Sequence, residues 1–210
     1  MLKKPIFWLI LLPTIAVLTW LVLLPDQVNN DLAKVDPATY CADLQAERTK
    51  KDAFMRTNAE SPISDKSTFT GLTYFDADPS FRVVAKLEPF PNGQAEKLVI
   101  TMTDGSKETY EKYAHATFAL GGESCRLLVL KYQTTLTVLF QDATSGQATY
   151  GGGRYLDIEP NMVTGNQVIL DFNAAYNPYC AYNPTYACPL PPPENKLTIA
   201  VKAGERYAHD

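Results

Sequence analysis

The chain has 210 residues, of which 46% are apolar and 20% are charged. This composition is typical of a folded protein with a sizeable core, and it excludes general disorder. Beyond residue 25 the chain carries 17 basic and 23 acidic side chains, a net charge of −6, with no block of basic residues. Nucleic acid is therefore excluded as an expected partner.

The N-terminal segment fits a membrane span. Lys3 and Lys4 precede an uncharged apolar run from Pro5 to Leu24, whose 20 residues match the thickness of a bilayer core. A cleaved signal peptide is the alternative, but its apolar stretch has about 7–15 residues and a small-x-small cleavage site follows it. The sequence predicts an uncleaved transmembrane helix at residues 1–25, in contact with the membrane through residues 5–24.

Charge on either side of this run predicts its orientation. The two lysines favour the cytoplasmic side, whereas Asp26 and Asp31 follow the run and favour the outside. We therefore expect a single-pass protein of the cell inner membrane with a cytoplasmic N-terminus. Residues 26–210 would then be exported to the periplasmic side.

A short polar linker at residues 26–36 is expected to lead into one mainly β domain at residues 37–210. Asp36 and Pro37 form a helix start, with an N-cap and a proline at the first helical position. The helix-forming composition from Ala38 to about Glu60 predicts one amphipathic helix with a thin apolar stripe. Ser61-Pro62 ends it.

After residue 69 the apolar pattern changes to the alternation of β-strands. Asp104-Gly105 is a tight-turn signal, so residues 106–112 are expected to pair back on residues 97–103. No helical pattern alternates with the strands, which argues against a parallel sheet. The sequence predicts an antiparallel sandwich or barrel of about 8–10 strands. Strands are expected within residues 81–90, 97–103, 106–112, 126–132, 135–141, 166–172 and 195–201.

Common catalytic and cofactor motifs are absent from the sequence. It contains no Gly-Lys-Ser/Thr phosphate loop, no Gly-x-Ser-x-Gly and no His-Glu-x-x-His. Its two histidines, His115 and His209, are too few for a histidine-rich metal site. The sequence predicts no cofactor and no metal. A structural role is favoured for His115, with general-base chemistry as the alternative.

The four cysteines suggest a disulfide, because an even number in an exported domain favours pairing. Two successive Asn-Pro turns, in "AYNPYC" and "AYNPTYAC", bring Cys180 and Cys188 toward each other. We expect these two to form a bridge, with metal binding by the two thiolates as the alternative. Whether Cys41 and Cys125 pair stays open.

A polar stretch at residues 140–160 is the best candidate for a binding site. Around two Gly-containing bends it places Asp142, Thr144, Ser145, Thr149, Tyr150, Arg154, Tyr155 and Asp157. The guanidinium of Arg154 could hold a carboxylate or phosphate of a ligand. Alternatively, Arg154 pairs with Asp142 or Asp171 inside the fold and fixes the loops.

Several long motifs resemble the bacterial and archaeal family called domain of unknown function 1684, over about residues 45–207. They are "YFDADPSFRVVAKLEPF", "QDATSGQATYGGGRYLD", "DFNAAYNPYCAYNPTYACPLPPPENKL" and "AGE" at 203–205. The resemblance implies a shared fold and brings no activity, cofactor or partner with it. Its signature positions are Asp142, Thr144, Ser145, Gly146, Thr149, Tyr150, Arg154, Tyr155, Asp171, Asn173, Tyr176, Asn177, Pro178, Cys180, Cys188, Pro189, Pro191, Glu194 and Asn195.

Three functions follow as hypotheses. The first is binding of a small polar ligand or cell-envelope component by Asp142, Thr144, Tyr150, Arg154, Tyr155, Asp171, Asn173, Tyr176, Asn177, Glu194 and Asn195. The second is a metal-free hydrolase with Asp142 or Asp171 as base and Ser145 as nucleophile. The third is a structural assembly protein of the envelope, which would present an exposed apolar patch.

Overall fold

The computed structural model describes residues 28–90 and 96–207. The predicted anchor at residues 1–25 and His209 lie outside these ranges. No helix in the two described ranges is both long and apolar enough to cross a membrane. Part of the expected linker is described, and there the backbone N–H of Asn29 donates to Gln167 Oε1 at 3.2 Å.

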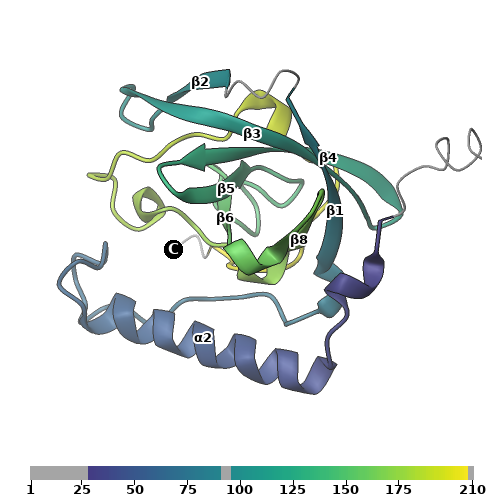
Figure 1. Cartoon of the computed structure of the whole chain (residues 1–210). Coiled ribbons are helices and arrows are strands. Elements are labelled where there is room, and N and C mark those ends of the chain that lie inside the picture. The colour runs from purple at the N-terminus through teal and green to yellow at the C-terminus, as the bar shows by residue number, and fades with distance from the viewer. Residues whose placement is uncertain (1–27, 91–95, 208–210) are drawn as a thin grey trace, which may run out of the picture.

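An eight-stranded antiparallel sheet curls into a half-barrel, and one α-helix lies along its side (Figure 1). The strands are β1 (Arg82–Pro89), β2 (Glu96–Thr101), β3 (Lys107–Leu120), β4 (Glu123–Tyr132), β5 (Thr135–Phe140), β6 (Arg154–Ile158), β7 (Val163–Thr164) and β8 (Gln167–Asp171). Their order is β6-β5-β4-β3-β1-β8-β7, and β2 pairs with β3 beside this path. The helices are α2 (Pro37–Thr57) and the short 3-10 turns η1 (Asn30–Ala33), η2 (Pro79–Phe81), η4 (Pro160–Met162), η5 (Phe172–Ala174), η6 (Tyr179–Ala181) and η7 (Pro193–Asn195).

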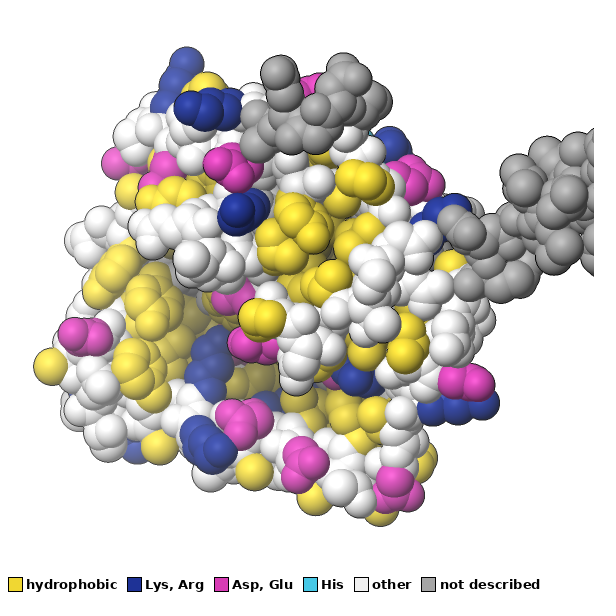
Figure 2. Space-filling view, viewed as in Figure 1, with side chains coloured by type: hydrophobic (Ala, Val, Ile, Leu, Met, Phe, Trp, Pro, Cys, Tyr) yellow, Lys and Arg dark blue, Asp and Glu magenta, His cyan; other side chains and the backbone are white. Residues whose placement is uncertain are grey.

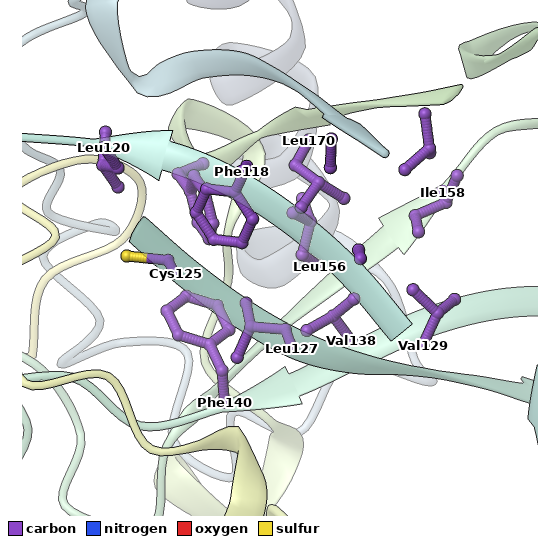
Figure 3. Close-up of a cluster of buried hydrophobic side chains, with 14 of the residues drawn as sticks. Phe118, Leu120, Cys125, Leu127, Val129, Val138, Phe140, Leu156, Ile158 and Leu170 are labelled. Atoms are coloured by element: carbon purple, nitrogen blue, oxygen red, sulfur yellow. The ribbon is translucent and has the colours of Figure 1, made fainter. Parts of the chain in front are cut away.

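The main core fills the inside of the curled sheet (Figure 3). Strand β3 contributes Ala116, Phe118 and Leu120 at alternate positions, as expected for a strand with one buried face. A smaller cluster, which includes Ile100, Tyr110 and Leu130, lies apart from the main core. The alternation seen in the sequence therefore predicts correctly which side chains of these strands are buried.

The prediction of a mainly β, antiparallel fold with one helix is confirmed, but the sheet forms neither a closed barrel nor a two-sheet sandwich. Its described strands form one path that ends at β6 and β7. Irregular C-terminal chain fills part of the interior instead, because Ala175, Leu197, Val201 and Ala203 all belong to the main core. Apolar side chains outside the strands thus replace the strands that would have closed the barrel.

The predicted hairpin at Asp104-Gly105 is confirmed, since β2 and β3 pair from Glu96 opposite Lys112 to Thr101 opposite Lys107. The expected strand at residues 195–201 is wrong. Its backbone makes one isolated bridge, from Lys196 to Gln141, and continues without a ladder. The apolar pattern there reflects burial of side chains in the core, which extended chain achieves without strand pairing.

Helix α2 begins as the sequence predicts, with the Asp36 side chain accepting a hydrogen bond from the Thr39 N–H at 2.9 Å. Among its side chains only Met55 is fully buried. Polar contacts carry much of the docking instead, so the helix is less amphipathic than expected. The Tyr40 hydroxyl donates to Asp171 at 2.8 Å, and Arg48 Nη1 donates to the Phe75 carbonyl at 3.0 Å.

Candidate functional site

A half-open pocket of about 400 Å³ lies between the segment after helix α2 and the C-terminal segment of the chain. We call residues 63–73 the strap and this cavity the strap pocket. Hydroxyl groups and one carboxylate line the strap side, from Ser64, Asp65, Thr68, Thr70 and Thr73. The opposite wall carries Ala181, Tyr182, Arg206 and Tyr207.

The strap is fixed at both ends by hydrogen bonds to the rest of the protein. Near its start, Asn183 Nδ2 donates to Ser64 Oγ at 3.1 Å. Near its end, the Leu72 N–H donates to Asp52 Oδ1 at 2.8 Å, and the Arg206 N–H donates to the Thr73 carbonyl at 2.9 Å. The strap pocket is therefore formed before any ligand binds, which lowers the entropic cost of binding.

Opposite charges line the two walls of the strap pocket. Hydrogen bonds from the Ser67 hydroxyl and N–H lower the pKa of Asp65, so its carboxylate is ionised at neutral pH. On the other wall, the Arg206 guanidinium lies over the Phe75 ring, 5.4 Å from its centre. No carboxylate of the described residues forms an ion pair with Arg206.

A buried carboxylate lies behind the strap pocket. Glu205 is 0% exposed and accepts hydrogen bonds from the Tyr182 hydroxyl at 2.7 Å and the Asn177 N–H at 2.8 Å. Lys51 of α2 approaches it to 2.6 Å and lies over the Tyr176 ring. Figure 2 shows the surface hollowed above α2, with hydrophobic, cationic and acidic side chains inside the hollow.

The predicted ligand residue Arg154 lies inside the fold, 1% exposed. Its Nη2 donates to Asp142 Oδ2 and to the Val201 carbonyl, both at 2.8 Å. Its Nη1 donates to the carbonyls of Ala203 and Glu205. Of the two partners inside the fold that the sequence suggested for Arg154, Asp142 is the one that it contacts. The guanidinium thus fastens the C-terminal segment to β6 and has no side exposed to a ligand.

Asp142 also holds its own loop. Its Oδ1 accepts hydrogen bonds from the Thr144 N–H at 2.7 Å and the Thr144 hydroxyl at 2.6 Å. The Ser145 hydroxyl accepts a hydrogen bond from the Asp142 N–H at 3.1 Å. Because the Asp142 side chain is 1% exposed and already bonded to Arg154, the geometry gives it no role as a base for Ser145.

Asp171 is also occupied within the fold. It accepts hydrogen bonds from the Tyr40 hydroxyl and pairs with Arg82 Nη1 at 3.2 Å, which joins α2 to the sheet. Nearby, the Asn173 side chain bonds both the N–H and the carbonyl of Asp78, at 3.0 and 2.8 Å. Both residues therefore connect segments that are distant in the sequence.

The Asn195 side chain connects strands β4 and β5. Its amide bonds the N–H and carbonyl of Leu128 on β4 and the carbonyl of Leu139 on β5, at 2.6, 2.9 and 2.9 Å. The neighbouring Glu194 extends outward and contacts His115 Nε2 at 2.8 Å.

Of the three tyrosines predicted to bind the ligand, Tyr155 and Tyr176 contact each other, and all three have partners within the fold. Tyr155 and Tyr176 form a backbone bridge with their rings edge to face, and the Tyr155 hydroxyl donates to the Pro189 carbonyl at 2.6 Å. Tyr150 contacts the ring of Tyr207, which lines the strap pocket. Its hydroxyl points to Cys180 Sγ at 3.9 Å.

The two Asn-Pro turns bring Cys180 and Cys188 together as expected, but all four cysteines are free thiols in this structure. The predicted Cys180–Cys188 disulfide is therefore absent. A hydrogen bond links the pair instead, with the Cys180 N–H donating to Cys188 Sγ at 3.2 Å. Loop stability comes from the surrounding contacts, such as the Cys188 N–H donating to Thr103 Oγ1 at 3.0 Å.

A shallow apolar groove of about 260 Å³ lies elsewhere, between strand β2 and the proline-rich segment 190–193. Its walls include Val99, which is 58% exposed, and Leu190. This groove and the strap were both missed by the sequence-based site prediction. The available signal for the strap was its density of Ser, Thr and Asp residues directly after the helix.

The model of the family described as "Protein of unknown function (DUF1684)" matches residues 67–206. A similar solved structure is the solution NMR structure of an uncharacterised protein from Haloarcula marismortui. The two share 40% sequence identity and a TM-score of 0.63, and the match covers 80% of this chain and 95% of the other. No curated protein matches the chain. The chain belongs to the DUF1684 family.

Proposed function

We propose that this protein is a membrane-anchored, exported binding protein that holds a small polar molecule in the strap pocket. The anchor at residues 1–25, contact with the inner membrane through residues 5–24 and export of residues 26–210 are part of this proposal. They are supported by the lysines before the apolar run and by the length of the run.

The observation that carries the proposal is a preformed cavity lined by complementary polar groups. Its volume of about 400 Å³ is within the range of small-molecule sites, about 300–1,000 Å³. Arg206 provides a cationic fork for a carboxylate or phosphate, while Asp65 and the threonine hydroxyls can accept or donate hydrogen bonds. The ligand is then a small molecule with one anionic group and several hydroxyl or amine groups.

The buried signature residues support this function indirectly. Arg154 anchors the C-terminal segment just before Arg206, and Glu205 fixes Tyr182 on the same wall of the strap pocket. A site held by packed and hydrogen-bonded neighbours keeps its geometry before the ligand arrives. The motifs that define the family would thus build the frame, and the strap would supply ligand contacts.

An envelope-assembly role is the second candidate, favoured by the apolar groove beside β2. Exposed apolar side chains such as Val99 and Leu190 are typical of contacts with another protein or a membrane component. If this groove carries the function, Val99→Asp should abolish it while leaving ligand binding in the strap pocket intact. The hydrolase hypothesis has no comparable support, because Asp142 and Asp171 are both held by cationic partners inside the fold.

The test is thermal unfolding of the full-length protein with inorganic phosphate, succinate or glycine as probes. A ligand at 100 times its Kd stabilises a protein by about 2.7 kcal/mol, which raises Tm by roughly 5–11 °C for a chain of this size. We expect at least one probe to raise Tm in the wild type and in Lys202→Gln, but not in Arg206→Gln. Lys202 is the matched control, because it is exposed and does not line the strap pocket.

A further inference from the structure

We propose that Cys180 and Cys188 form a redox-active dithiol, in which Cys180 reacts with a hydroperoxide and Cys188 resolves the product. This activity is separate from ligand binding in the strap pocket and does not depend on it. The inference begins from two free cysteines that lie side by side, with the Cys180 N–H donating to Cys188 Sγ at 3.2 Å.

The hydrogen bonds around the pair distinguish the two sulfurs. Cys180 Sγ accepts a hydrogen bond from the Tyr150 hydroxyl at 3.9 Å. Cys188 Sγ accepts the Cys180 backbone N–H at 3.2 Å. The hydroxyl donor at Cys180 stabilises this sulfur as the thiolate, which is the nucleophilic form of cysteine.

The ionisation of the pair agrees with this geometry. The hydrogen bond from the Cys188 thiol lowers the pKa of Cys180 to about 7, although burial opposes the shift. That same bond, together with burial, raises the pKa of Cys188. The ionisable side chains that influence the pair are Tyr110, Tyr150 and Tyr155, and burial raises the pKa of each, so all three are neutral at pH 7.

The reaction balances without any further reactant. The Cys180 thiolate attacks one oxygen of the hydroperoxide, the O–O bond breaks, and Cys180 becomes a sulfenic acid while hydroxide or alkoxide leaves. The Cys188 sulfur then attacks the Cys180 sulfur, forms the S–S bond and displaces the sulfenic oxygen. The two thiol protons end on the two leaving oxygens. Two thiols are oxidised by two electrons, and one peroxide is reduced.

Burial of the pair favours a small oxidant. Cys180 is 9% exposed and Cys188 is 6% exposed, so a folded protein carrying a disulfide has no direct approach to either sulfur. A hydroperoxide is small enough to reach Cys180 with little movement of the loop. Closing the pair then requires little rearrangement, because the two residues are already in contact.

The other two cysteines provide internal controls. Cys125 is buried in the main core, and burial raises the pKa of its thiol, so it should react slowly. Cys41 is half-exposed on α2 and reports general oxidation by the reagent. A specific reaction therefore has to oxidise Cys180 and Cys188 before it oxidises Cys41.

The experiment treats the reduced full-length protein with rising amounts of hydrogen peroxide, blocks remaining thiols with iodoacetamide, and maps the peptides by mass spectrometry. We expect a peptide linked through Cys180 and Cys188, two hydrogens lighter than the dithiol form, while Cys41 and Cys125 are still alkylated. Alkylation of Cys180 and Cys188 at peroxide levels that already oxidise Cys41 would overturn the proposal.

Variants separate the two roles. Cys188→Ser should stop the reaction at a Cys180 sulfenic acid that dimedone traps, because the resolving thiol is gone. In Cys180→Ser, Cys188 should react no faster than Cys125, and trapping at Cys188 would contradict the assignment. Tyr150→Phe tests the hydroxyl as a positioning group. The pH midpoint of Cys180 alkylation should be higher in this variant than in the wild type.

Discussion

The contact between Arg154 and Asp142 gives the sharpest prediction about stability. Both side chains are 1% exposed, and Arg154→Met leaves the Asp142 carboxylate buried without its cation. Removing one partner of a buried ion pair costs about 3–5 kcal/mol. For a chain of this size, that loss lowers Tm by roughly 6–20 °C. The carbonyls of Val201, Ala203 and Glu205 lose their donor in the same variant, which adds to the effect.

The assay is thermal unfolding of the full-length protein, followed by circular dichroism, with a matched surface variant as control. Arg126 pairs with Glu88 at 3.6 Å, but the two side chains are 55% and 46% exposed. Arg126→Met should therefore change stability by no more than about 1 kcal/mol. If Arg154→Met unfolds within about 2 °C of this control, the structural role assigned to Arg154 is refuted.

Three further predictions follow from the same contacts and use the same unfolding assay. Asn195→Ala removes the amide that joins β4 to β5 and leaves buried backbone groups unpaired, so the free energy of unfolding should fall by about 2–4 kcal/mol. A loss under about 0.5 kcal/mol would contradict the bridging role of this side chain. Tyr40→Phe should cost about 1–2 kcal/mol, because Asp171 loses one donor but keeps Arg82, and a neutral result would show that α2 docks without it. Gly153→Ala should prevent stable folding, because a Cβ at this position, where φ is +94°, would lie 2.7 Å from the Phe140 carbonyl oxygen. The control Gly105→Ala places its Cβ where no atom lies within 4 Å, so it should cost only about 1–2 kcal/mol of backbone strain. Equal losses of stability in the two variants would disprove the steric argument.

Strand positions could be predicted from sequence wherever one face of the sheet is buried. Strand β3 shows this most clearly, because its alternate residues enter the core and the Asp104-Gly105 turn fixes its register with β2. Residues 195–201 show the same alternation, but their strand pairing is limited to one isolated bridge between Lys196 and Gln141. Periodicity records which side chains are buried, and it does not record which backbone groups find a partner in a neighbouring strand.

The candidate site was harder to predict for a related physical reason. A polar side chain such as Arg154 or Asn195 has the same appearance in a sequence whether it contacts a ligand or satisfies buried backbone groups. Buried carbonyls need donors wherever chain is irregular, and the C-terminal segment of this protein is irregular and buried. Its signature residues fulfil that need. The strap has no period and no long motif, so its pocket becomes visible only when residues 63–73 meet Arg206 in space.

Binding in the strap pocket is tested most directly by NMR. Amide resonances of the 15N-labelled full-length protein would be followed while succinate or inorganic phosphate is added. We expect the shifted resonances to cluster in the strap and around Tyr182 and Arg206, and to lose their response in Arg206→Gln but not in Lys202→Gln. Shifts that cluster instead beside Val99 and Leu190, or a response that survives Arg206→Gln unchanged, would contradict the strap pocket as the binding site.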